Sequence, residues 1–489
     1  MKNSSKVWLW LVATAFLVVC AVGLIYSNNH NATKNELWRL TDLDKIVFLT
    51  SSNDAIVFEG RNFDEWNCLC VYAADKATGN ILWSTEELAA PYIADYKKLN
   101  PQSSRIPGIV EVIETDSKRH AVYIIVNSSA LYALSESDGN IIWGPVSVAS
   151  FNTGQSENLD LLFLANENNY LSAFDKSSGQ LMWQTESLLE DPSYHSRLMI
   201  QGNTIFIAIE SDNNAKLFAV DVDSGKKLWE TDIRSNRFAY VFAENSLYLI
   251  WQGYYDEQIG QISVFDLKSG TNIWNASFPD YALDPSPPQV IGNQIYVVEN
   301  KDETVSKLVA RGAKDGDTLW EFNQDYSYGE IRYIAYNDIV YVGSEVGDVF
   351  ALNAKTGQEI WKTETKAFPT CMTVLHDSLI VGARLNYVAS FNAQSGVQKW
   401  AQSISVKTNR DDCFENGNTF IVSNDKLLVV DSNRKINFLD IETGYKIWSW
   451  KDPRFWRIIP IYKPVPGIGQ IDDNAIYVIN AGIFTLKMP

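Results

Sequence analysis

The chain is poor in cysteine, histidine and basic residues, and each shortage argues against a class of protein. Its 489 residues include only five cysteines and four histidines. These are too few for a disulfide-rich fold, and the histidines lack the spacing of metal ligands. Lysine and arginine number 41 against 59 aspartates and glutamates, which gives a net charge of −18. Nucleic acid and anionic lipid both attract basic surfaces, so neither is expected as a partner.

The cysteines do not form a recognisable metal-binding pattern either. Cys68 and Cys70 would face the same side of a strand, but no second pair of cysteines or histidines accompanies them. We therefore expect small buried thiols at these two positions. Cys371 and Cys413 occupy similar places in consecutive repeats, where a disulfide between them is an alternative to two free thiols.

An apolar run opens the chain behind Lys2 and Lys6. Val7–Tyr26 is uncharged and long enough to cross a bilayer, which takes about 20 residues in a helix. The sequence Gly23–Ser27 that follows its core is a poor cleavage site for a signal peptidase. We therefore expect an uncleaved signal anchor over residues 1–27, a transmembrane helix with a cytoplasmic N-terminus.

The rest of the chain is expected outside the cytoplasm, at the cell surface or in the periplasm. A removed signal peptide or a lipidated Cys20 would lead to the same compartment. The polar residues 28–43 are expected to form a tether, and residues 44–489 the folded domain.

One short pattern occurs nine times, most clearly as Val349-Phe-Ala-Leu-Asn-Ala-Lys-Thr-Gly-Gln-Glu-Ile-Trp361. It predicts a strand, a polar turn that ends in glycine, and a second strand with a tryptophan four residues after the glycine. Aspartate or asparagine usually stands four residues before the glycine, where it can bond to the turn backbone. We expect the glycine to shape the turn and the tryptophan to pack between repeats. The pairs are Gly79 and Trp83, Gly139 and Trp143, Gly179 and Trp183, Gly225 and Trp229, Gly270 and Trp274, Gly316 and Trp320, Gly357 and Trp361, Gly396 and Trp400, and Gly444 and Trp448.

The spacing of this pattern predicts the fold. Successive tryptophans are 39 to 60 residues apart, with about four short apolar strands in each unit and no stretch patterned as an amphipathic helix. Such a period is typical of β-propeller blades, which bury both faces by stacking around a ring. We expect an all-β propeller in which an N-terminal strand completes the last, C-terminal half-unit.

The repeat resembles the blade motif of the PQQ-like, or quinoprotein-like, repeat family over residues 44–489. The resemblance implies four-stranded blades, eight in number, although the nine copies of the pattern make nine the alternative. It also implies one of two functions. PQQ-dependent alcohol dehydrogenases hold their cofactor under two adjacent, disulfide-linked cysteines and bind Ca²⁺, whereas BamB-type scaffolds bind protein partners without a cofactor. No two cysteines are adjacent here.

We therefore expect a membrane-tethered, BamB-like scaffold that binds protein partners and has no catalytic, cofactor or metal site. The alternatives are a dehydrogenase that uses PQQ with Ca²⁺ and a sensor of a small ligand or polysaccharide. Long loops, expected at Pro91–Pro107 and Lys451–Pro466, and exposed aromatic residues are where partners tend to bind. The candidate partner-binding residues are Trp251, Tyr254, Tyr255, Phe455 and Trp456.

Overall fold

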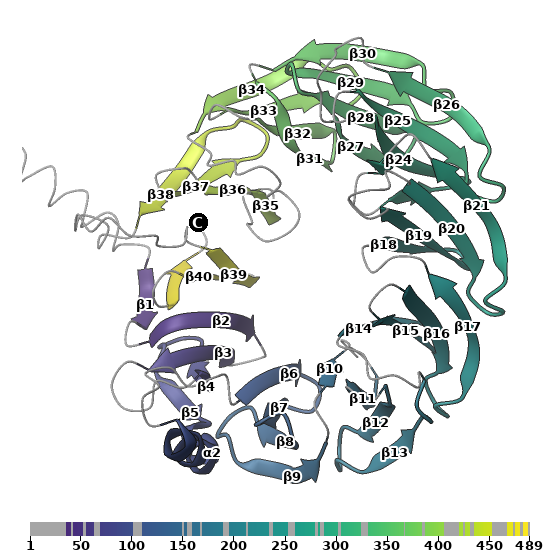
Figure 1. The fold of residues 1–489 in the computed structure, drawn as a ribbon. Helices are drawn as coiled ribbons and strands as arrows, with labels where there is room; N and C mark the ends of the chain where they lie inside the picture. Colours follow the sequence, from purple (N-terminus) through teal and green to yellow (C-terminus); the bar gives the residue numbers. More distant parts are fainter. Residues whose placement is uncertain are drawn as a thin grey trace, which may run out of the picture.

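In the computed structural model the chain forms antiparallel sheets that follow one another around a ring (Figure 1). The described residues make up ten such sheets, which we number 1 to 10 around the ring. These residues are 36–40, 43–51, 55–62, 69–100, 110–148, 151–153, 159–166, 169–188, 195–211, 214–233, 238–252, 260–278, 282–283, 288–301, 305–323, 331–365, 367–383, 387–404, 420–423, 426–430, 435–451, 467–472, 475–479 and 483–487.

Sheets 1 to 5 each contain four strands in sequence order, from the centre of the ring to its outer edge. Sheet 1 is β2 (Leu43–Ser51), β3 (Ala55–Asn62), β4 (Leu69–Asp75) and β5 (Ile81–Ser84). Sheet 2 is β6 (Val110–Asp116), β7 (Ala121–Val126), β8 (Ala130–Ser135) and β9 (Ile141–Ser147). Sheet 3 is β10 (Phe151–Thr153), β11 (Leu161–Asn166), β12 (Leu171–Asp175) and β13 (Leu181–Gln184). Sheet 4 is β14 (His195–Gln201), β15 (Thr204–Ser211), β16 (Asn214–Asp221) and β17 (Lys227–Ile233). Sheet 5 is β18 (Phe238–Ala243), β19 (Ser246–Gln252), β20 (Gly260–Asp266) and β21 (Asn272–Phe278).

Sheets 6 to 9 repeat this order, except that two short strands share the innermost place in sheet 6. Sheet 6 is β22 (Ala282–Leu283), β23 (Gln289–Ile291), β24 (Gln294–Lys301), β25 (Val305–Gly312) and β26 (Thr318–Asn323). Sheet 7 is β27 (Ile331–Tyr336), β28 (Ile339–Ser344), β29 (Asp348–Asn353) and β30 (Glu359–Glu364). Sheet 8 is β31 (Pro369–Leu375), β32 (Ser378–Ala383), β33 (Tyr387–Asn392) and β34 (Gln398–Ser403). Sheet 9 is β35 (Phe420–Ser423), β36 (Lys426–Val430), β37 (Lys435–Asp440) and β38 (Lys446–Lys451).

Sheet 10 joins the two ends of the chain. It consists of β39 (Gly467–Asp472), β40 (Ala475–Ile479), β41 (Ile483–Lys487) and β1 (Glu36–Leu40), and β1 pairs antiparallel with β41 as the outer strand. The expectation that an N-terminal strand completes the last sheet is confirmed. This strand lies inside the segment 28–43 that the sequence suggested as a tether.

The expected number of eight blades, with nine as the alternative, is wrong for the described sheets, which number ten. A ring of eight blades would require the first Gly–Trp unit to share its sheet with the C-terminal strands. Instead, that unit has four strands of its own, β2 to β5, and the closing strand β1 lies upstream of it. The outer turn of sheet 10 does not exist, because its third and fourth strands come from opposite ends of the chain. A glycine-containing turn is therefore absent from the tenth copy.

The middle strands are apolar on both faces because each sheet is packed between two others. All six residues of β7 and of β32 are buried, as are the first five of β8 and of β29. The outer strands differ, since their side chains are mostly exposed apart from the tryptophan, as in β5 and β30. The core therefore lies between sheets, and the outer edges form the perimeter of the ring (Figure 1).

A helix follows the outer strand of sheet 1, where the sequence suggested only a loop. Helix α2 (Glu86–Leu99) buries Ala89 and Ile93 in the core shared by sheets 1 and 2. Acidic residues occupy its first turn and basic residues its last, as the helix dipole favours. Pro91 lies inside it, and a proline at that place usually ends a helix. Burial of the apolar face outweighs this effect.

The structure describes two of the five cysteines. Cys70 in β4 and Cys371 in β31 are both disulfide-bonded, so the expectation of a free buried thiol is wrong for Cys70. Cys68 and Cys413 lie outside the described residues, and the pairing of Cys371 with Cys413 stays a prediction.

No described helix is long and apolar enough to cross a membrane. The expected span at Val7–Tyr26 lies outside the described residues.

Candidate functional site

Eight of the nine motif tryptophans, and Trp38 of β1, form the same contact with the next sheet around the ring. The indole Nε1 donates to the backbone carbonyl of the residue three before the motif glycine of that sheet, over 2.7 to 3.1 Å. For example, Trp143 of sheet 2 donates to Lys176 of sheet 3, and Trp400 of sheet 8 to Ile441 of sheet 9. Trp38 of β1 makes this contact from sheet 10 to Lys76 of sheet 1. The nine contacts connect sheet 10 through sheets 1 to 9.

The turn glycine accommodates the tryptophan ring of the preceding sheet. All nine motif glycines have φ between +66° and +76°, a region that disfavours a side chain. A Cβ atom at any of them would also lie closer than 3.0 Å to that ring. At Gly179, for instance, the obstruction is Trp143. The motif tryptophans and glycines are thus assigned to contacts between sheets.

Trp448 of sheet 9 is the exception. Its ring stacks on Phe438 of its own sheet, with ring centroids 4.5 Å apart. Its Nε1 has no hydrogen-bond partner among the residues that the structure describes. The junction between sheets 9 and 10 therefore lacks, in the described residues, the contact found at the other nine.

Sheets 1 to 3 differ from the others at two positions of the repeat. The first is the residue that supplies the carbonyl acceptor. It is charged in sheets 1 to 3 and apolar in sheets 4 to 9: Lys76, Glu136 and Lys176, against Val222, Leu267, Ala313, Ala354, Ala393 and Ile441. The second is the residue two before the tryptophan. It is apolar in sheets 1 to 3 and polar in sheets 4 to 9: Ile81, Ile141 and Leu181, against Lys227, Asn272, Thr318, Glu359, Gln398 and Lys446.

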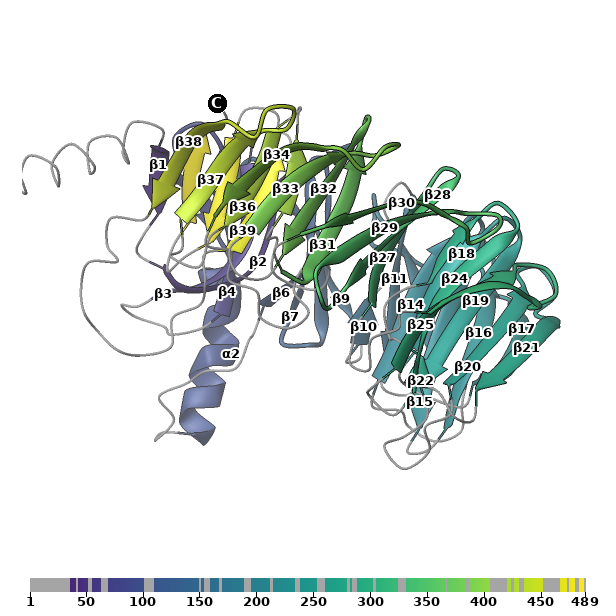
Figure 2. The ribbon, with the colours of Figure 1, turned by 90° about the horizontal axis from the view of Figure 1, so that it is seen from above.

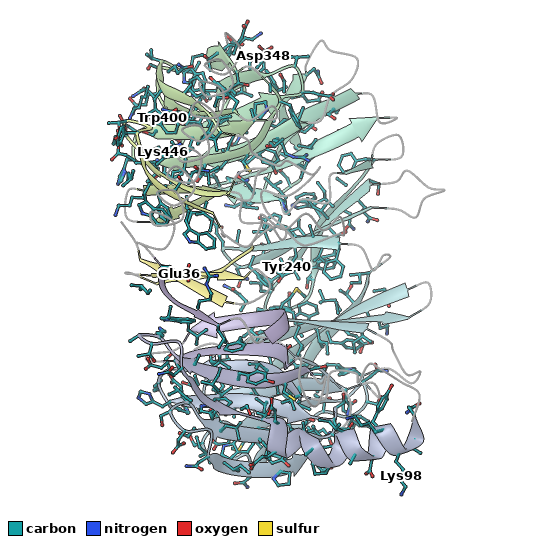
Figure 3. All side chains as sticks on the ribbon, turned by 90° about the vertical axis from the view of Figure 1, so that its left-hand side faces the viewer. Glu36, Lys98, Tyr240, Asp348, Trp400 and Lys446 are labelled. Carbon is teal, nitrogen blue, oxygen red and sulfur yellow. The ribbon has the colours of Figure 1, made fainter. Side chains whose placement is uncertain are left out.

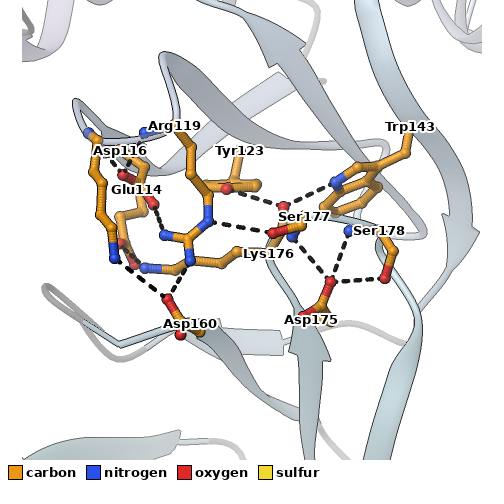
Figure 4. A network of polar contacts seen from close by, with 11 residues as sticks. Glu114, Asp116, Arg119, Tyr123, Trp143, Asp160, Asp175, Lys176, Ser177 and Ser178 are labelled. Carbon is orange, nitrogen blue, oxygen red and sulfur yellow. Dashed lines mark hydrogen bonds and ion pairs between the residues drawn. The ribbon is translucent and has the colours of Figure 1, made fainter.

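The charged residue of sheet 3 belongs to a polar network between sheets 2 and 3 (Figure 4). The Lys176 ammonium forms an ion pair with Glu114 of β6, and their side chains are 1% and 7% exposed. The Lys176 carbonyl also accepts hydrogen bonds from Trp143 at 2.9 Å and from the hydroxyl of Tyr123 at 3.1 Å. This lysine therefore joins the two sheets through both its side chain and its backbone.

Arg119 adds a second link at the edge of the same network. Its guanidinium contacts Asp116 of its own sheet at 2.7 Å and forms an ion pair with Asp160 of sheet 3 (Figure 4). Burial tends to raise the pKa of Asp116, but the hydrogen bonds and charge of Arg119 outweigh it and hold that pKa below its ordinary value. Arg119 likewise lowers the pKa of Asp160. Both carboxylates thus stay charged at neutral pH, and Arg119 bridges sheets 2 and 3.

An apolar surface lies on the outer edges of sheets 1 to 3, which we call the rim patch. Each edge strand begins with two apolar residues, and these are 42–54% exposed. No charged residue occurs in β5, β9, β13 or β21, whereas β17, β26, β30, β34 and β38 all contain one or more. Charged residues on an edge strand discourage association. Among the described outer strands, those of sheets 1 to 3 alone combine the absence of charge with two apolar residues at the start. The rim patch comprises Ile81, Leu82, Ile141, Ile142, Leu181 and Met182.

The side of the ring on which the rim patch lies follows from two residues at the same repeat position in other sheets. Glu36 of β1 and Lys446 of β38 occupy the repeat position of Ile81, two residues before a tryptophan. Figure 3 shows both on one side of the ring, while Lys98 near the end of α2 lies on the other. Figure 2 likewise shows α2 extending from the ring on the side away from β1. The outer strands thus begin, with the rim patch, on the side where β1 begins.

The sequence of the repeats matches a known family. The family model described as outer membrane protein assembly factor BamB matches residues 70–243, 214–370 and 308–451, which together span most of the chain. The chain belongs to this family.

The individual proteins that this chain resembles are distant in sequence. The outer membrane protein assembly factor BamB of Yersinia pestis is 23% identical over 353 residues, which cover 67% of this chain and 83% of that protein. The tetrathionate hydrolase of Acidithiobacillus ferrooxidans is 24% identical over 252 residues, 44% of this chain and 48% of the hydrolase. The crystal structure of BamB from Moraxella catarrhalis aligns over 69% of this chain and 100% of its own, with 16% identity and a TM-score of 0.40.

The described residues do not test the partner-binding residues expected from the sequence. Trp251 lies on β19, and its side chain is not described; Tyr254, Tyr255, Phe455 and Trp456 lie outside the described residues. The rim patch was missed, although a comparison of the repeats at the position two before the tryptophan would have revealed it. Among described residues, no group of three or more His, Cys, Asp or Glu side chains is placed to hold a metal ion.

Proposed function

We propose that the chain is a membrane-tethered, extracytoplasmic scaffold that binds protein partners. Membership of the BamB family supports this, because the Yersinia relative is by its name a factor in outer membrane protein assembly. The disulfide-bonded Cys70 and Cys371 support an oxidising compartment outside the cytoplasm. The tether is the expected signal anchor at residues 1–27.

The main support for a binding role is that helix α2 extends from the ring on the side away from β1 (Figures 2 and 3). Its first half packs on sheet 1, where Thr85 accepts a hydrogen bond from the Val71 amide at 3.0 Å and Glu86 one from the Tyr72 hydroxyl at 2.7 Å. Its end is exposed, and Leu99 is 80% exposed, more than any other large apolar side chain described. A firmly held helix with a free apolar end suits the anchoring of a partner.

Site-specific crosslinking tests this proposal. A photoactivatable amino acid replaces Lys98 in the full chain in cell membranes, and Val397, an exposed turn residue of sheet 8, serves as the control position. We expect discrete protein adducts from position 98, lost when Leu99→Asp is added, and none from position 397. Protein adducts that are equal at both positions, or that survive Leu99→Asp, would contradict a partner site on α2.

Fractionation tests the tether separately. The full chain should stay with the membrane pellet after carbonate extraction, and a variant without residues 1–27 should not. Release of the full chain by carbonate would refute the signal anchor.

A further inference from the structure

We propose that the rim patch of sheets 1 to 3 lies against the bilayer that anchors the chain, so that the ring rests on its edge on the membrane surface. The inference goes beyond partner binding but rests on the tether of the proposed function. Its basis is a surface whose position, composition and distance from the anchor all suit lipid.

The position of the rim patch relative to the bilayer follows from the place of β1 in the ring. The expected transmembrane span ends at Tyr26, and only the nine residues 27–35 separate it from Glu36. At about 3.3–3.6 Å per residue, nine residues reach at most about 30 Å. The start of β1 must therefore stay near the bilayer surface. The rim patch starts on the same side of the ring, and its first sheet is joined to β1 by the bond from Trp38 to the Lys76 carbonyl.

The contacts between sheets place the three pairs of rim-patch residues in succession along the edge. Trp83, directly after Leu82, packs on Gly139, which lies two residues before Ile141. In the same way Trp143, directly after Ile142, packs on Gly179, two residues before Leu181. The apolar ends of three consecutive outer strands thus follow one another along the edge of the ring.

The composition favours lipid over protein as the occupant. Energetically important residues of protein interfaces are most often tryptophan, tyrosine and arginine, whereas all six rim-patch residues are aliphatic and their strands carry no charge. A charged group is costly in the hydrocarbon core of a bilayer, and none occurs in β5, β9 or β13. With a net charge of −18, the chain cannot rely on attraction to anionic headgroups. We infer a contact that is hydrophobic and independent of salt.

The polar network between sheets 2 and 3 connects the two sheets that carry the second and third strands of the rim patch. The buried pair of Lys176 and Glu114 and the links of Arg119 join sheets 2 and 3. A rigid edge loses little conformational freedom on contact with a flat surface. The charged repeat position and the apolar rim occur in the same three sheets.

The test uses the full chain reconstituted in nanodiscs of neutral phosphatidylcholine. A photoactivatable amino acid replaces Ile142, and the matched control is Ile360, which holds the same repeat position in sheet 7 with similar exposure. We expect lipid adducts from position 142 at least tenfold more abundant than from position 360, with no change between low and high salt. Equal lipid adducts at the two positions, or protein adducts at position 142 in membranes that contain the natural partners, would overturn the proposal.

A second variant separates this contact from partner binding and from misfolding. Ile81→Lys, Ile141→Lys and Leu181→Lys together give sheets 1 to 3 the lysine that sheets 4 and 9 carry at this position, so folding is expected to survive. Lipid adducts from position 142 should disappear, while protein adducts from position 98 and carbonate resistance persist. Lipid adducts that persist in this variant would refute the rim patch alone, whereas loss of carbonate resistance in the unmodified chain would refute the tether and the rim patch together.

Discussion

The buried pair of Lys176 and Glu114 allows a quantitative prediction about the junction of sheets 2 and 3. Six other sheets carry an apolar residue at the position of Lys176, so the site tolerates one sterically. Lys176→Leu should nevertheless destabilise the chain by about 3–5 kcal/mol, because it leaves the Glu114 carboxylate buried without its ammonium partner. Solvent does not screen this ion pair appreciably, since both side chains are almost fully buried.

Restoring electrical balance should restore stability. In the double variant Lys176→Leu with Glu114→Leu, no charge of the pair remains to be buried, and we expect stability within about 1–2 kcal/mol of the original. The control is Lys216→Leu, which removes an ion pair with Glu230 at 3.0 Å whose side chains are over a third exposed. That change should cost less than about 1 kcal/mol.

The assay is urea unfolding of the detergent-solubilised full chain, followed by tryptophan fluorescence. The reasoning would be refuted if Lys176→Leu cost no more than Lys216→Leu. It would equally fail if the double variant were as unstable as the sum of the two single variants, since the pair would then contribute independently rather than as one buried unit.

Three further predictions concern the repeat itself. Trp400→Phe should cost about 1–3 kcal/mol more than Trp448→Phe in urea unfolding, because only the former leaves a buried carbonyl acceptor unpaired; equal costs would contradict the role of the indole bond. Gly202→Ala should cost about 1–2 kcal/mol for its positive φ, with no atom within 4 Å of the new methyl group. Gly179→Ala should cost about 1–3 kcal/mol more, because it also displaces a tryptophan ring, and equal unfolding midpoints for the two would count against that contact. Finally, bonds from Thr443 hold the pKa of Asp440 below its ordinary value of 3.8. Its stabilisation is therefore fully present above about pH 4 and is lost as the pH falls through the lowered pKa, so Asp440→Asn should flatten stability against pH below 4, and an unchanged slope would contradict this.

Much of the fold could be predicted from the sequence because the repeat reports local geometry. The Gly-to-Trp interval fixes a turn and a strand, and nine copies with a common period imply stacked four-stranded sheets. The tenth sheet could not be counted in this way. Trp38 makes the same contact as the other tryptophans, but Lys34 stands at the glycine position because no turn connects β41 to β1.

Helix α2 was missed because Pro91 concealed a pattern that its other residues show. Leu88, Tyr92 and Tyr96 recur every four residues and pack together against the core of sheets 1 and 2. A proline inside a helix removes one hydrogen bond, and the burial of the apolar face outweighs this local cost.

The candidate site was harder to predict because it depends on differences between copies rather than on their similarity. Exposed aromatic residues drew attention to loops, whereas the distinctive surface is aliphatic and lies on regular strands. The exposure of Ile141 cannot be predicted from one repeat, because Trp143 on the same strand packs against the next sheet while Ile141 does not. Only the ring arrangement shows that Ile81, Ile141 and Leu181 share one edge.

One crosslinking experiment tests the central claim, a tethered ring that presents α2 to protein partners. The photoactivatable amino acid is placed in turn at Lys98, Ile142 and Val397 of the full chain in its native membranes, and the adducts are identified by mass spectrometry. We predict a discrete protein adduct at position 98, lipid at position 142 and neither at position 397. An absence of protein adducts at position 98, with the chain present in the membrane, would contradict the account.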